Sequence, residues 1–146
     1  MPAKYKLVLR KDMRKDAAEG SKLYYASANT TGTCDVYELC DLISAQSTAS
    51  SGDVKLILDE LVNVMRRNLG KGEVVKVGEL GSFQLQFGST GTVTEKEFNQ
   101  VLIKSRRIVF RPGKLLKEAV KNYTFEKIAS GALDEGGGED DRPGEL

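Results

Sequence analysis

The sequence has no histidine, only two cysteines and no long apolar run. Without histidine, the chain cannot build a Ser-His-Asp or Cys-His catalytic group, and it lacks the commonest zinc ligand. Two cysteines alone cannot form a closed structural zinc site. No apolar stretch approaches the roughly 18 residues that a transmembrane helix requires. These absences argue against enzymes of those classes, zinc-stabilised domains and membrane-spanning proteins.

The two cysteines, Cys34 and Cys40, are predicted to be reduced packing residues. On a helix this spacing turns the chain through about 600°, which leaves the two thiols on different faces. A disulfide between them would require that helix to open. The first ten residues have neither an apolar signal core nor a small-residue cleavage site. We therefore expect a cytoplasmic protein, and nothing in the sequence indicates a cofactor.

Charge is distributed unevenly along the chain. Residues 129–146 contain one Arg and six acidic side chains, a net charge of −5, whereas residues 1–128 carry +6. A basic body favours polyanionic partners. The acidic, Gly-rich segment has the composition of a disordered, solvated tail. The alternative is that this tail folds back and competes with a polyanion for the basic surface.

Hydrophobic periodicity predicts a strand hairpin followed by a helical hairpin. The strands are expected at residues 4–10 and 22–28, where apolar and polar residues alternate. The first helix has Thr33 or Asp35 as its N-cap. The second begins with Ser50-x-x-Asp53, an acidic variant of the capping box, and ends at two glycines. Its apolar face is wide for so small a domain, so we expect it to contact a second subunit as well as its own chain.

Three more strands and a short helix are predicted after the helical hairpin. The first strand holds Val74, Val75 and Val77, and "GELG" turns the chain. The second strand directs Phe83, Leu85 and Phe87 into the core. A connector follows, with a helical turn at 94–98 and with Val93 and Phe98 packed inward. The third strand is "VLIKSRRIVF", and the last helix directs Leu115, Leu116 and Ala119 inward.

Two motifs carry a family resemblance. Residues 77–83 read "VGELGSF" and residues 110–114 read "FRPGK", with a short helix after the second motif. In this order, after a helical hairpin, they resemble the bacterial histone-like HU and integration-host-factor family over residues 33–122. The resemblance implies an α+β fold: a helical-hairpin base, a three-stranded antiparallel sheet with a β-arm, a C-terminal helix and an intertwined homodimer.

The added segments resemble a divergent branch of that family. Residues 1–32 are interpreted as an N-terminal β-hairpin extension, 33–128 as the HU-like DNA-binding domain, and 129–146 as the disordered tail. The implied function is non-sequence-specific binding of double-stranded DNA through its phosphates by a nucleoid-associated homodimer. No enzymatic activity and no small-molecule substrate are implied.

The β-arm departs from the family pattern. The segment between Phe83 and Phe110 is short, contains no proline and carries "TEKEFN" where the family has a proline-bearing tip. Leu80 also replaces the aromatic residue usual in the first motif. Apolar wedges kink DNA when they insert between base steps. We therefore expect a shortened arm with weak DNA kinking, or none.

Cations cluster where the last strand meets the last helix. Strand alternation places Arg107 and Arg111 on the face opposite Ile108 and Phe110. The Pro-Gly break exposes backbone N–H groups at the helix start, which attract anions. The alternative is that these cations only solvate an edge strand and a helix end. With the resemblance, the predicted DNA-binding residues are Lys104, Arg106, Arg107, Arg111, Gly113, Lys114, Lys117 and Lys121.

Other charged and aromatic residues leave alternatives open. Arg66 and Arg67 lie near a helix end, where cations stabilise the helix dipole. The cations of residues 1–33, which carry a net charge of +4, either extend a DNA footprint or solvate a hairpin. Tyr24 and Tyr25 are interpreted as sheet packing rather than base stacking. The alternative function for the whole chain is an HU-fold protein-interaction module that has lost DNA binding.

Overall fold

The computed structural model describes residues 1–129, which form parts of two units. The first unit comprises Met1–Thr33 and the described residues from Lys121 onward, and the second comprises Cys34–Val120. The first boundary therefore falls within one residue of the predicted one. The second unit ends earlier than the predicted limit at residue 128, because the chain returns to the first unit. The predicted tail lies, except for Ala129, outside the described residues.

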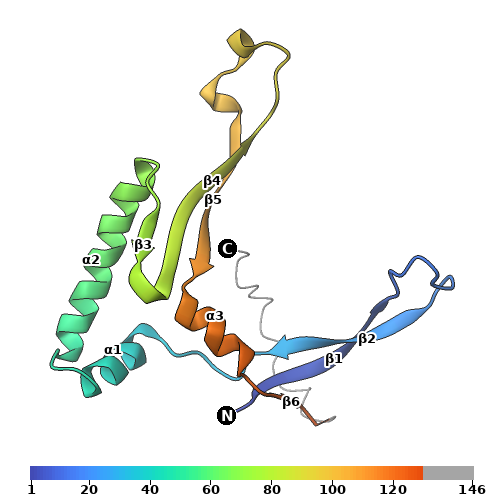
Figure 1. The fold of residues 1–146 in the computed structure, drawn as a ribbon, viewed down its shortest axis with the longest axis horizontal. Helices are drawn as coiled ribbons and strands as arrows, with labels where there is room; N and C mark the ends of the chain where they lie inside the picture. The colour runs from blue at the N-terminus through green and yellow to red at the C-terminus, as the bar shows by residue number, and fades with distance from the viewer. Residues whose placement is uncertain (130–146) are drawn as a thin grey trace. The chain divides into compact units, whose positions relative to one another are not determined.

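The first unit is a sheet built on a two-stranded ribbon. β1 (Ala3–Lys11) and β2 (Lys22–Asn29) pair antiparallel along their length, as the alternation predicts. β6 (Phe125–Lys127) adds in parallel to the other edge of β1, so the strand order is β2-β1-β6 (Figure 1). β6 was not predicted, because three residues carry too little periodicity to signal a strand.

A carboxylate organises the loop at the end of this ribbon. Asp12 is buried, and it accepts hydrogen bonds from the backbone N–H of Arg14 (3.0 Å) and from Nη2 of the same residue (2.7 Å). The hydrogen bonds from the Arg14 side chain hold the pKa of Asp12 below its ordinary value. The charged carboxylate is therefore the form that closes the loop.

Acid is expected to loosen this loop. A carboxyl whose pKa is lowered on folding stabilises the fold above the ordinary value of 3.8, and this contribution is lost as the pH falls through the lower folded value. An NMR titration should place the Asp12 inflection below 3.8. At neutral pH, Asp12→Asn should accelerate amide hydrogen exchange in residues 12–21, while Asp16→Asn should not. An inflection at or above 3.8 would contradict this account.

The second unit begins with the helical hairpin. Asp35 caps α1 (Val36–Ala45) by accepting from the Glu38 N–H (2.9 Å). Ser50 and Asp53 form the predicted capping box of α2 (Ser51–Gly70). Cys34 and Cys40 are both free, but only Cys40 is buried, so the predicted packing role is wrong for Cys34.

The sheet of the second unit follows α2. β3 (Val75–Val77), β4 (Gly81–Ser89) and β5 (Ile103–Pro112) are antiparallel in the order β3-β4-β5. The 3-10 turns are η1 (Gly78–Leu80), η2 (Glu95–Glu97) and η3 (Gln100–Leu102), and the last helix is α3 (Lys114–Lys121). β4 and β5 continue past α2 as an arm (Figure 1). The predicted α+β fold is therefore confirmed.

Few apolar side chains are buried within the chain. Among the described residues, the buried hydrophobic side chains are Cys40, Val54 and Leu69. The inward orientation predicted for several others is wrong, because helices cover only part of one sheet face and none covers the arm; these exposed residues are Phe87, Val93, Phe98, Leu115 and Leu116. None of the helices in the described part of the chain could span a bilayer.

Candidate nucleic-acid interface

The two motifs pack directly against each other. The Gly113 N–H donates to the Leu80 carbonyl oxygen (3.0 Å), which joins the start of α3 to the turn before β4. The rings of Phe83 and Phe110 lie 4.9 Å apart between centroids. A Cβ on Gly81 would lie 2.2 Å from the Arg111 carbonyl oxygen. The glycines of both motifs therefore serve close backbone packing that positions the cations around them.

This contact changes the role expected of Gly113. Its N–H is occupied by Leu80, and a Cβ at this position would lie 2.2 Å from the Glu79 carbonyl oxygen. The first helical bond of α3 runs from the Lys117 N–H to the Gly113 carbonyl oxygen (3.1 Å). The N–H groups that lack a helical acceptor are thus those of residues 114–116. The anion-attracting end of α3 begins one residue later than the sequence indicates.

Neutral side chains hold the arginines of β5. Arg111 Nη1 donates to Gln84 Oε1 (3.1 Å), and Arg107 Nη2 donates to Gln86 Oε1 (3.4 Å). Both arginines are exposed, and neither forms an ion pair within residues 1–129. A neutral partner orients a guanidinium while leaving its charge available. The glutamines were missed in the sequence, although "FQLQF" places them on the face opposite Phe83 and Leu85.

An irregularity in the arm decides where Lys104 lies. Gln86 pairs with Arg107, but Gly88 pairs with Lys104, so Ser105 and Arg106 together face Phe87. Ser105 adopts a positive φ of 54°, as bulge residues do. The extra residue shifts the alternation and brings Lys104 to the side of Arg107 and Arg111. We call these three residues the basic face.

The remaining predicted cations lie elsewhere. Arg106 lines a hollow with Leu85, Phe87 and Val101 on the opposite side of the arm. On α3, the sequence spacing of Lys114, Lys117 and Lys121 puts them on one helix face. The Lys114 side chain is 82% exposed, and its Nζ lies 4.0 Å from Glu118 Oε1, which partly offsets its charge. The structure therefore brings three of the eight predicted residues onto one strand face and three onto one side of α3.

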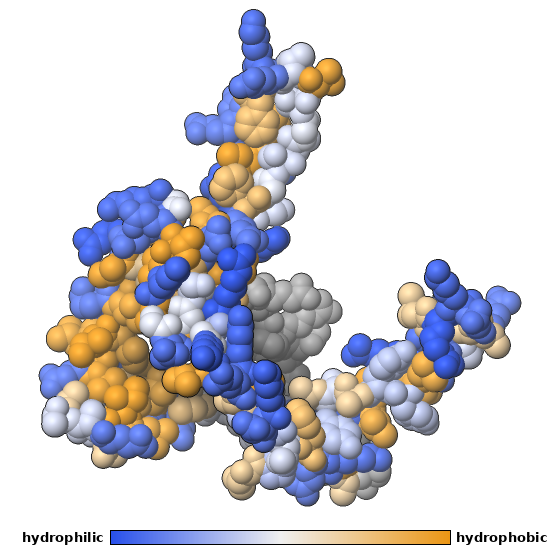
Figure 2. Space-filling model, in the orientation of Figure 1, coloured by the Kyte–Doolittle hydropathy of each residue, from blue (hydrophilic) through white to orange (hydrophobic). Residues whose placement is uncertain are grey.

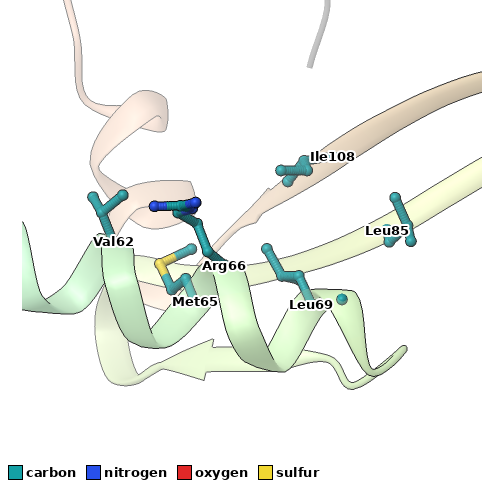
Figure 3. Close-up of a pocket in the computed structure, with 7 residues that line it drawn as sticks. Val62, Met65, Arg66, Leu69, Leu85 and Ile108 are labelled. Carbon is teal, nitrogen blue, oxygen red and sulfur yellow. The ribbon is translucent and has the colours of Figure 1, made fainter.

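The other side of the sheet forms an open apolar hollow against α2. Figure 3 shows Val62, Met65 and Leu69 from α2 facing Leu85 of β4 and Ile108 of β5, with Arg66 across the opening. Val62 is 56% exposed and Ile108 is 43% exposed. This part of the core lacks a cover within its own chain.

Comparisons with known proteins agree with this arrangement. The DNA-binding protein HU of Thermotoga maritima is 36% identical over 86 residues, which cover 58% of this chain and 96% of that protein. Integration host factor subunit alpha of Vibrio cholerae is 33% identical over 92 residues, which cover 62% of this chain and 94% of the subunit.

A solved protein from Bacteroides vulgatus shares the fold, with a TM-score of 0.60 and 21% identity over 86% of this chain. The match covers 48% of that protein, so this chain spans about half of its length. A family model described as an HU domain fused to a wHTH, Ig or glycine-rich motif matches residues 1–127. Since that model covers most of the sequence, the predicted resemblance is confirmed and the chain belongs to the HU-HIG family.

Proposed function

We propose that this protein is a cytoplasmic, nucleoid-associated homodimer that binds double-stranded DNA through its phosphates, without sequence specificity and without enzymatic activity. The basic face carries the proposal. Lys104, Arg107 and Arg111 present three exposed cations on one strand face, and the two arginines are oriented by glutamines that leave their charge uncompensated. Binding that ignores sequence needs cations placed to meet phosphates and little else.

Uncovered apolar surface supports the homodimer. The hollow between α2 and the sheet is lined by apolar side chains, and Leu56 (60% exposed) and Ile57 (62% exposed) also lie uncovered on α2. Monomeric soluble proteins rarely expose apolar patches larger than a few hundred Å². A second copy of the same chain would bury these faces. Sedimentation should therefore give twice the chain mass of 16.0 kDa, and a stable monomer would contradict the homodimer.

The charge at the arm end supports weak DNA kinking. Val93 is 96% exposed there, so an apolar side chain is present. Glu95 and Glu97 outnumber Lys96 close by, and this net negative charge opposes insertion between base pairs. Energy transfer between dyes on the two ends of a short duplex should therefore change little on binding. A large rise in transfer would show that the arm kinks DNA.

Fluorescence anisotropy tests the function directly. A labelled duplex of arbitrary sequence is titrated with the full chain at several salt concentrations. We expect submicromolar binding at low salt that weakens linearly in log[salt], with similar affinity for an unrelated duplex. The slope counts the phosphate contacts. A stable dimer that fails to bind at low salt would instead support the alternative, an HU-fold module that binds other proteins.

Removal of the acidic segment should tighten DNA binding. Deleting residues 131–146 removes a net charge of −5 from a chain whose remainder is basic. We expect higher duplex affinity at low salt and a smaller difference at high salt, because screening suppresses the repulsion. The same anisotropy titration measures both. Equal affinity at low salt would mean that the tail neither repels DNA nor competes for the basic face.

A further inference from the structure

The loop end of the β1–β2 ribbon carries a cation pair that does not stabilise the fold. Lys11 lies directly across from Lys22 in the antiparallel register, and both residues are exposed. Like charges in directly opposed positions destabilise a strand pair. Neither lysine forms an ion pair in the part of the chain that the structure describes. An anionic partner would convert this repulsion into attraction.

The acidic residues that could neutralise the ribbon are partly engaged elsewhere. Asp12 is bound by Arg14, and Glu126 of β6 pairs with Lys4. Residues 1–33 carry a net charge of +4, so the ribbon retains positive charge after these pairs form. In Figure 2, hydrophilic residues cover most of its loop end.

The same ribbon face also presents apolar surface. Leu9 pairs with Tyr24 one position closer to the base on that face, two residues along each strand from the lysine pair. Leu9 is 50% exposed and Tyr24 is 71% exposed. Tyr24 therefore does not pack into the sheet as the sequence indicated. We call Leu9, Lys11, Lys22 and Tyr24 the ribbon face.

We propose that the ribbon face is a second DNA-binding element, which enters the major groove of duplex DNA. A two-stranded β-ribbon fits the B-DNA major groove, which is about 12 Å wide. The lysine pair would then meet phosphates, while Leu9 and Tyr24 contact base edges and thymine methyl groups. This inference goes beyond the proposed function, which uses the second unit alone.

A charge-matched pair of variants tests the proposal in the full chain. Lys11→Gln/Lys22→Gln should lower the salt slope of duplex binding by about 2 and weaken binding at 0.1 M salt at least about fivefold. Lys71→Gln/Lys76→Gln removes the same charge from exposed positions of the second unit and should change the slope less. The melting temperature of the first variant should equal or exceed that of the wild type, because the cross-strand repulsion is gone.

Dimethyl sulfate protection places the ribbon in a groove, because guanine N7 lies in the major groove. The wild type should protect a tract of N7 atoms that Lys11→Gln/Lys22→Gln leaves reactive. Wild-type binding with no difference between the two double variants would overturn the ribbon proposal and leave the proposed function standing. Absent protection would overturn the groove placement. If the wild type does not bind duplex at low salt, both proposals fail.

Discussion

Gly81→Ala is expected to destabilise the HU domain by about 3 kcal/mol or more, since backbone strain and overpacking add. Gly81 is buried and has a φ of +139°, a conformation that residues with a Cβ rarely adopt. The new methyl group would also lie 2.2 Å from the Arg111 carbonyl oxygen and 2.8 Å from the Phe110 ring. Backbone and a packed ring cannot move aside cheaply, so the turn and the strand it contacts must separate.

Urea denaturation at fixed protein concentration measures this loss. Gly91→Ala is the matched control, because a Cβ there has nothing within 4 Å and the position has no positive φ. We expect the control to unfold near the wild-type midpoint. A Gly81→Ala midpoint equal to that of the control would show that the two motifs do not pack as described.

Lys104→Gln/Arg107→Gln/Arg111→Gln is expected to abolish most duplex binding. Three lost phosphate contacts should lower the salt slope by about 3 and weaken binding at 0.1 M salt by about 100-fold or more. The side chains are exposed, so the variant should keep the wild-type melting temperature within a few degrees. Anisotropy at several salt concentrations gives the slope and affinity, and calorimetry gives the melting temperature.

Two adjacent arginines provide the sharpest control for this prediction. Arg107 lies on the basic face, whereas Arg106 lines the hollow on the other side of the arm. Arg107→Gln should lower the salt slope by about 1, and Arg106→Gln should leave it nearly unchanged. Equal effects of the two substitutions would show that total charge, rather than the basic face, governs binding.

Local sequence signals were sufficient where the structure depends on neighbouring residues. Asp35 and the Ser50–Asp53 pair cap their helices as expected, because capping uses residues within one turn. The ribbon strands and the arm strands follow from alternation. The positions of Arg107 and Arg111 on one face follow from the same period of two.

Packing between distant segments could not be predicted in this way. β6 forms only because the chain returns to β1, more than 100 residues away in sequence. Gly113 was expected to serve an anion, yet its N–H binds Leu80 across the motif contact. Inward orientation was assumed for Phe87 and Leu115, although a single chain has too few layers to cover them.

The sequence by itself determined the family, the α+β element order and the basic character of the body, because these follow from motifs, periodicity and charge. Only the tertiary structure decided which cations share a surface. The bulge at Ser105 shifts the strand alternation, so that Lys104 joins Arg107 and Arg111 while Arg106 turns away. The strand register likewise opposes Lys11 and Lys22, which lie far apart in the sequence. Both outcomes depend on pairing between strands, and one strand's own residues do not specify its register.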